Sequence, residues 1–100
     1  MTIRHVVTWK LAAEDERART EDATEIARLL ESLVGTVTEI LSLQVGANVA
    51  YPESNWDVVL IADYEDVAAL ERYQVHPAHK EVAARIRQLV TQRACVDFEL

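Results

Sequence analysis

The sequence predicts an α+β fold of the ferredoxin-like type, a β-α-β-β-α-β chain with a four-stranded antiparallel sheet. Three observations predict it. Alternating apolar residues mark both ends of the chain as strands, two segments have the apolar spacing of amphipathic helices, and two further strand patterns lie between those segments. A chain of 100 residues has room for one such domain, which we expect over residues 1–100.

The opening strand and the helix after it have clear patterns. Residues 2–11 alternate, and one side of this strand carries Ile3, His5, Val7, Trp9 and Leu11. The segment 14–34 changes to helical spacing, with apolar residues recurring at Ala23, Ile26, Ala27, Leu30, Leu33 and Val34. Gly35 follows, and because glycine commonly ends helices, we expect the helix to stop there.

The middle of the chain predicts two strands joined by a turn. Residues 38–49 and 56–64 have strand patterns, and residues 51–55 have the polar and proline content of a turn. The run 58–62 has no polar side, and a strand that is apolar on both faces is typically buried on both. Since we expect helices on only one face of the sheet, we expect a second copy of the chain to cover the other.

The last third predicts a helix, a break and a second helix before the final strand. Asp66 is placed to cap a helix that begins at Val67. Pro77 cannot continue that helix and suits the first turn of a new one. The apolar face of the new helix is formed by Val82, Ile86, Leu89 and Val90. Residues 94–100 then alternate, which predicts the fourth strand.

Charge and composition argue against several kinds of partner. Ten basic and 17 acidic residues give a net charge of −7 without a basic cluster, so we expect neither nucleic-acid nor membrane binding. The first residues lack the pattern of a signal peptide, and no apolar stretch is long enough to span a membrane. Cys95 is the single cysteine, which excludes an intrachain disulfide. These features predict a cytoplasmic protein.

The histidines are the candidates for chemistry. His5 occupies a strand position where the pattern calls for an apolar residue. His76 and His79 flank Pro77 at the helix break, and Tyr73 lies about one turn earlier. Imidazole is the usual proton-transfer group near neutral pH. If the first strand lies beneath the second helix, His5 and one of the other histidines would share a cavity with Tyr73.

Two other interpretations use the same residues. Each residue could be structural, with His5 in the core, His76 as a helix cap, His79 on the surface and Tyr73 as core filling. The three histidines could instead hold a transition metal. Against a metal site, Pro77 disturbs the turn that would aim His76 and His79 together, and the sequence contains no His-Glu-x-x-His motif.

Four segments resemble the stress-responsive dimeric α/β-barrel (Dabb) family, in the family's order and over essentially the whole chain. They are Ile3-Arg4-His5-Val6-Val7, Trp56-Asp57-Val58-Val59-Leu60, Tyr73-Gln74-Val75-His76-Pro77-Ala78-His79 and Val96-Asp97-Phe98-Glu99. The Tyr-x-x-His-Pro-x-His segment is the most specific of them. The resemblance implies a ferredoxin-like protomer whose helix-free sheet face packs against a partner's sheet, so that a barrel forms across a homodimer.

Resemblance to one branch of this family, the branch of olivetolic acid cyclase, implies a function. That branch closes a polyketide by intramolecular aldol condensation without a cofactor, and its paired histidines and its tyrosine correspond by motif to His5, His79 and Tyr73. The resemblance implies a pocket between sheet and helices that takes a small hydrophobic or polyketide-like ligand. We expect the pocket lining to include Val7, Trp9, Leu30, Leu60 and Leu89.

Two alternatives to a cyclase or aldol-type lyase stay open. The same residues suit a non-catalytic dimer, stress-associated or ligand-binding, because the family also includes stress-induced plant proteins and many bacterial members of unknown role. A monooxygenase-like role follows by analogy with other dimeric ferredoxin-like barrels, and the lack of a haem or flavin motif disfavours it.

Overall fold

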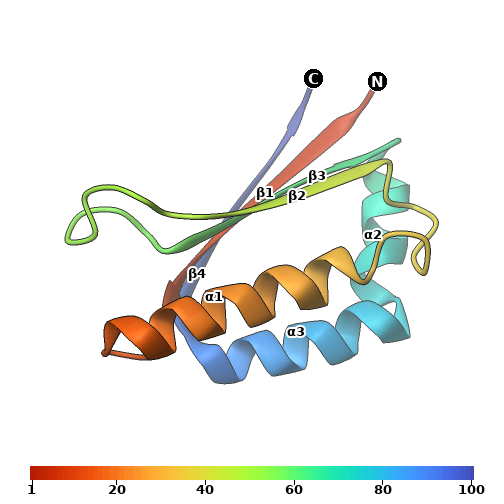
Figure 1. Cartoon of the computed structure of the whole chain (residues 1–100). Helices are drawn as coiled ribbons and strands as arrows, with labels where there is room; N and C mark the ends of the chain where they lie inside the picture. The colour runs from red at the N-terminus through yellow and green to blue at the C-terminus, as the bar shows by residue number, and fades with distance from the viewer.

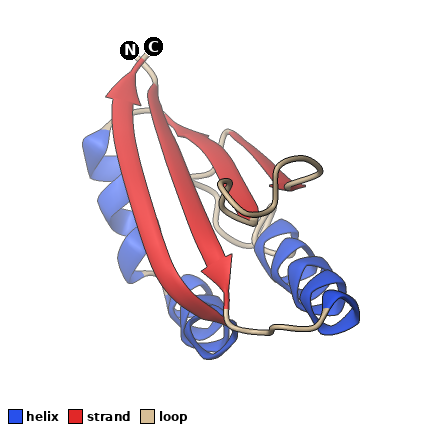
Figure 2. Ribbon diagram, turned by 90° about the vertical axis from the view of Figure 1, so that its left-hand side faces the viewer, coloured by secondary structure: helices blue, strands red, loops and turns tan.

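Four strands and three helices form two layers in the computed structural model, which describes residues 1–100. In chain order the elements are β1 (Ile3–Leu11), α1 (Glu16–Glu31), β2 (Ser42–Ala47), β3 (Val58–Tyr64), α2 (Val67–Val75), α3 (Pro77–Leu89) and β4 (Val90–Glu99). The sheet order is β2-β3-β1-β4, and every neighbouring pair is antiparallel. All three helices lie on one face of the sheet (Figures 1 and 2), so the predicted ferredoxin-like fold is confirmed.

Three element boundaries differ from the sequence prediction by three residues or more. The first helix ends at Glu31 rather than 34, because the chain turns through Gly35 at a φ of 87° and then buries Val37. The second strand begins at Ser42 rather than 38, since that turn region continues to about residue 40. The last strand begins at Val90 rather than 94, directly after α3 and without a connecting loop.

Side-chain caps fix where the helices begin. The Asp15 carboxylate accepts the backbone N–H groups of Arg17 and Ala18 at the start of α1, at 3.0 and 3.1 Å. Asp66 caps α2 as predicted, accepting the N–H of Ala69 at 2.8 Å. His76 lies between α2 and α3 and caps α3, where its Nδ1 accepts the N–H of Ala78 at 3.1 Å. The helical stretch is therefore divided at the proline, as expected.

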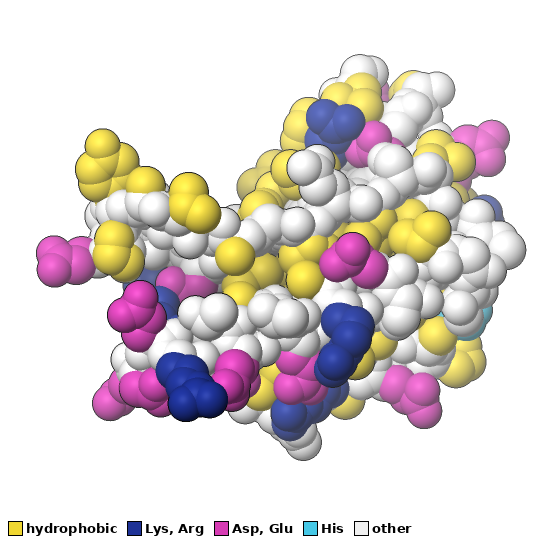
Figure 3. Space-filling model, in the orientation of Figure 1, with side chains coloured by type: hydrophobic (Ala, Val, Ile, Leu, Met, Phe, Trp, Pro, Cys, Tyr) yellow, Lys and Arg dark blue, Asp and Glu magenta, His cyan; other side chains and the backbone are white.

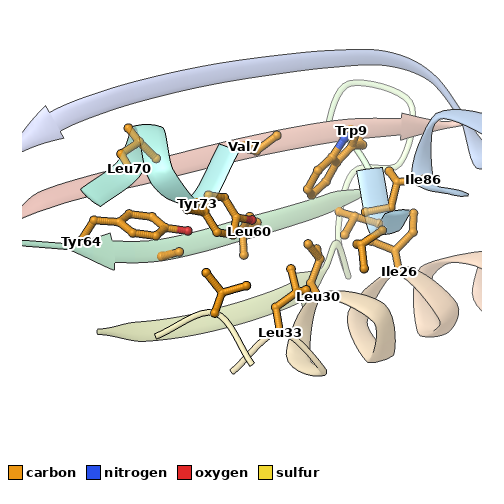
Figure 4. Packing of buried hydrophobic residues seen from close by; sticks show 14 of the residues in the cluster. Val7, Trp9, Ile26, Leu30, Leu33, Leu60, Tyr64, Leu70, Tyr73 and Ile86 are labelled. Carbon is orange, nitrogen blue, oxygen red and sulfur yellow. The ribbon is translucent and has the colours of Figure 1, made fainter. Parts of the chain in front are cut away.

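An apolar core fills the space between the sheet and the helices (Figure 4). The predicted inner side of β1 is confirmed, because all five of its residues are buried, with His5 the single polar one. The buried side of β3 faces the same core, and α1 contributes Ile26 and Leu30 from the helical layer. A buried imidazole in this apolar layer requires a hydrogen-bond partner.

Asp57 joins three elements at one end of the core. Its carboxylate accepts the N–H of Leu11 at 2.8 Å and pairs with the Arg19 guanidinium of α1. Its own N–H donates to the carbonyl of Trp9 at 2.9 Å. The end of β1, the start of β3 and α1 are thereby held together beside Trp9.

The helix-free face of the sheet has an apolar centre. Val6 lies opposite Ile61 of β3 and opposite Val96 of β4, so the three side chains share this face. Val96 is 63% exposed and Phe98 is 44% exposed. The run 58–62 is thus buried on the helix side, while Val59 and Ile61 are only half-buried in the single chain.

Charged side chains of both signs are interspersed over the helical layer in Figure 3, and apolar side chains show between this layer and the sheet. None of the helices is long and apolar enough to cross a membrane.

We predict that Ile26→Ala lowers the free energy of unfolding by about 2–5 kcal/mol, because Ile26 is fully buried and its truncation leaves a cavity. Val34→Ala is the control, since Val34 is more than half exposed, and its effect should stay within about 0.5 kcal/mol. Denaturant unfolding of both variants measures the difference. Equal effects of the two substitutions would contradict the assigned core.

Candidate functional site

A cavity of about 390 Å³ lies between the sheet and the helices α2 and α3. Its wall is mainly apolar, with polar groups converging from four elements, as is common in small-molecule sites. The lining residues are His5, Val7, Trp9, Leu30, Leu60, Tyr73, Gln74, His79, Val82, Ala83, Ile86, Arg87, Val90 and Arg93.

The structure brings most of the predicted site residues together around this cavity. His5, Tyr73 and His79 all line it, as do Val7, Trp9, Leu30 and Leu60. Leu89 does not line it, because its side chain is buried in the core near the end of α3. A wider depression of about 480 Å³ beside the β2–β3 loop contains one charged residue, Asp57, whose carboxylate already bonds Leu11 and Arg19.

His5 is held by a carboxylate from the neighbouring strand. It lies opposite Asp97 in the β1–β4 pairing, and its Nδ1 is 2.5 Å from Oδ1 of Asp97. An ionised carboxylate only accepts hydrogen bonds, so Nδ1 carries the proton and donates it. In the neutral ring the Nε2 atom of His5 is then an acceptor. His5 is 2% exposed, so this bond also satisfies a buried polar group.

Cys95 lies beside this pair, with its Sγ 3.4 Å from His5 Nδ1. Burial, followed by the negative charge of Asp97, raises the pKa of the Cys95 thiol. Reactive cysteines have the opposite character, because the thiolate is the nucleophile. Cys95 therefore packs against the dyad as a protonated thiol.

His79 is fixed by the backbone of the preceding helix. It lies in the first turn of α3, and its Nδ1 is 3.1 Å from the carbonyl oxygen of Gln74. A carbonyl only accepts, so Nδ1 donates and Nε2 keeps its lone pair. Burial lowers the pKa of His79 below its usual 6.5, although the bond to Gln74 acts in the other direction. The ring is therefore neutral at pH 7 and can accept a proton.

Tyr73 lies between the two histidines. Its ring centroid is 4.3 Å from that of His79 and 6.2 Å from that of His5. Tyr73 is 1% exposed, and burial raises its pKa, so the phenol stays protonated and can donate a hydrogen bond. Tyr64 packs against Tyr73, with 4.9 Å between the two ring centroids (Figure 4). The Tyr64 hydroxyl is buried without a hydrogen-bond partner.

The third histidine lies outside the site. His76 does not line the cavity, and its Nδ1 is occupied by the N–H of Ala78. The structure thus gives His76 the capping role and does not assemble a three-imidazole metal site. His5, Cys95 and Asp97 are the one group whose potential ligand atoms lie within 4.8 Å of one another. A metal there would have to displace the proton that His5 already shares with Asp97.

The sequence reasoning missed the polar residues that β4 contributes. Asp97, Cys95 and Arg93 lie on the side of β4 that faces the helices, while Val96 and Phe98 lie on the other side. A polar row on the inward side of a strand is the signal that could have identified them, because core-facing positions are normally apolar. Recognising it requires knowing which side of β4 faces the helices.

Sequence comparison places the chain near one protein family. The family model described as the stress responsive A/B barrel domain (Dabb) matches residues 3–100. No curated protein matches the sequence.

Solved structures share the fold over nearly the whole chain. A dimeric ferredoxin-like protein of unknown function from Bacteroides fragilis is 23% identical, with a TM-score of 0.89 over 99% of this chain and 96% of that chain. A similar dimeric protein from Thermobifida fusca is 25% identical, with a TM-score of 0.83 over 100% and 92%. Hydroxynitrile lyase from Passiflora edulis is 12% identical, with a TM-score of 0.79 over 97% and 91%.

We predict that His79 makes the protein less stable below about pH 6.5. Its pKa is lower in the folded than in the unfolded chain, so between the two values the unfolded chain binds more protons. The free energy of unfolding therefore falls as the pH drops from 6.5 and levels off below the folded pKa. Denaturant unfolding at a series of pH values, with His79→Gln beside the wild type, isolates this contribution. An unchanged pH dependence in His79→Gln would refute it.

Proposed function

Because this chain belongs to the stress responsive A/B barrel domain (Dabb) family, we propose that its His5–Tyr73–His79 cavity is the active site of a cofactor-independent, aldol-type cyclase or lyase. One observation carries the proposal: two imidazoles and a buried phenol converge on one mainly apolar cavity, and the Nδ1 atom of each imidazole is held by a hydrogen bond to another residue. A polyketide-like substrate is the ligand we propose for it.

His79 is the proposed general base. Its Nε2 would take the proton from a carbon between two carbonyl groups, where the C–H bond is acidic. Its lowered pKa keeps the ring unprotonated at neutral pH, and Gln74 holds the tautomer that this step needs. A fixed tautomer also fixes the direction in which the proton moves.

Tyr73 is the proposed electrostatic partner of the enolate. Removal of the proton shifts negative charge onto the carbonyl oxygen, and a protonated phenol can donate a hydrogen bond to it. Because burial raises the Tyr73 pKa, the phenol does not lose its own proton at neutral pH. The weakly screened interior strengthens that hydrogen bond.

The reaction balances without an external reagent. The enolate carbon attacks a second carbonyl of the same substrate, which forms a carbon–carbon bond and converts that carbonyl to an alkoxide. The alkoxide then takes this proton back from the His79 imidazolium, which restores the neutral base. His5 is the proposed orienting group: Asp97 holds its Nδ1–H, so Nε2 of the neutral ring can accept a hydrogen bond from a hydroxyl or enol group of the substrate.

We predict that His79→Gln lowers cyclisation of linear poly-β-keto acids and related poly-β-keto substrates by at least about 100-fold, and that Tyr73→Phe lowers it by a similar factor. His76→Asn is the matched control, because asparagine keeps an acceptor at the helix cap while His76 lies outside the cavity. Product formation is followed by chromatography and mass spectrometry. No cyclisation over the panel, or cyclisation that survives His79→Gln, would argue against the enzyme.

The alternative function is a non-catalytic small-ligand-binding dimer. The close packing of Tyr73 with Tyr64 and His79 favours it, since aromatic contacts of this kind also stabilise a core. In that case substitution of His5 or His79 would lower stability while leaving ligand binding in the cavity intact. The Passiflora lyase shares the fold with this chain, and that likeness does not choose between the two functions.

We further propose that the helix-free sheet face is the interface of a homodimer. Two observations support this: the solved relatives from Bacteroides fragilis and Thermobifida fusca are dimeric, and the face has Val6, Ile61, Val96 and Phe98 at its centre. An apolar centre of this kind is typical of homodimer interfaces.

We predict that Val96→Asp shifts the protein from dimer toward monomer, because it places a charge in the middle of the apolar face. Val34→Asp is the control, since Val34 is exposed at the end of the α1 region and brings the same change in net charge. Light scattering coupled to size exclusion over a dilution series reports the mass. A wild-type monomer at micromolar concentration, or equal behaviour of the two variants, would contradict the interface.

A further inference from the structure

Two arginines line the cavity without a carboxylate partner. Arg87 comes from the last turn of α3 and Arg93 from β4, and both side chains are exposed at the cavity wall. Most other arginines of the chain form ion pairs with acidic side chains, namely Arg4, Arg17, Arg19, Arg72 and Arg85. In a chain with seven excess negative charges, two unpaired cations at one cavity are unexpected.

The position of Arg93 directs its charge toward the candidate site. It lies opposite Trp9 in the β1–β4 pairing, on the side of β4 that faces the helices. Burial is the main influence on the pKa of both His79 and Tyr73. The charge of Arg93 adds to the lowering at His79 and opposes the raising at Tyr73. Arg93 therefore acts electrostatically on the two groups to which we give roles in proton transfer and oxyanion binding.

We propose that Arg93 and Arg87 bind an anionic group of the ligand at the mouth of the cavity, so that the ligand class is a carboxylate attached to an apolar body. This inference rests on the proposed function only for the location of the site. Guanidinium pairs with carboxylate through two parallel hydrogen bonds, which orients the ligand as well as attracting it.

The polarity and volume of the cavity indicate the character of the uncharged part of the ligand. Beyond the arginines most of the wall is formed by apolar side chains, among them Trp9, Leu60 and Ile86, and no further positive charge lies there near pH 7 to compensate a second negative charge of the ligand for its lost hydration. A volume of about 390 Å³ accommodates one or two fused rings or a folded chain of similar size. The acid would face the solvent and the reacting carbons would face His79 and Tyr73.

Two fluorescent probes with the same body test the proposal. 8-Anilino-1-naphthalenesulfonate is anionic, and N-phenyl-1-naphthylamine is its neutral counterpart. We expect Arg93→Gln to raise the dissociation constant of the anionic probe by about three- to tenfold, as for a partly exposed ion pair, and to change that of the neutral probe by less than about twofold. Arg87→Gln should act in the same direction, and Arg93→Lys should restore part of the affinity.

Arg28→Gln is the matched control. Arg28 also lacks an ion pair and is exposed, but it lies on α1 outside the cavity wall. Arg28→Gln removes one positive charge, as Arg93→Gln does, so the two variants have the same net charge. Anionic probe binding that weakens equally in Arg28→Gln would overturn the site, because the effect would then come from net charge alone. Equal loss of both probes in Arg93→Gln would also overturn it.

Competition identifies the preferred anion. 2-Naphthoate should displace the anionic probe from the wild type more strongly than methyl 2-naphthoate, and this advantage should disappear in Arg93→Gln. Inorganic phosphate at matched ionic strength should displace it weakly. If phosphate displaces it as well as 2-naphthoate does, the arginines bind free anions and the composite carboxylate site is refuted.

Failure of this proposal can be separated from failure of the proposed function, because none of these measurements requires turnover. Arg93-dependent binding in a protein that cyclises nothing would refute the enzyme and keep the anion site. The reverse outcome is cyclisation at an unchanged rate in Arg93→Gln and Arg87→Gln, together with an affinity for the anionic probe that neither substitution changes. That outcome would keep the enzyme and refute the anion site.

Discussion

The bond between His5 and Asp97 is the constraint on which the site depends. An imidazole that is 2% exposed inside an apolar layer is costly unless its N–H is satisfied, and the only carboxylate that meets it comes from the opposite end of the sequence. That carboxylate is in place because β1 and β4 pair in one register. The pairing of the first and last strands therefore determines the tautomer of His5, and with it the direction in which His5 can move a proton.

The site combines three ways of controlling the protonation of its groups. His5 is held by a carboxylate, His79 by a backbone carbonyl, and Tyr73 by burial. Near pH 7 His79 is thereby kept neutral and Tyr73 protonated, while the carboxylate fixes which nitrogen of His5 carries its proton. The two arginines at the rim then supply positive charge. Because both are exposed, they would attract an anion without desolvating a cation in the core.

Much of the fold and part of the site could be predicted from local sequence. The alternation of β1, the Asp66 cap and the break at Pro77 depend on neighbours in the chain, and all three are confirmed. The start of β4 could not be read from its pattern, because the strand follows α3 directly and no turn residue marks the boundary. Asp97 is 92 positions from His5, so only the strand register shows that the two meet. Arg93 is conspicuous only when the ion pairs of the other arginines are known.

The alternation along β4 has a practical consequence for protein engineering. Residues 93, 95 and 97 face the helices, whereas 94, 96 and 98 face the open side of the sheet. Two libraries can therefore be built on one short strand: substitutions at position 93 would retune ligand choice while Asp97 is kept, and even-numbered positions would retune self-association. An insertion of one residue within the strand would exchange the two sets, so such libraries should vary side chains and keep the length constant.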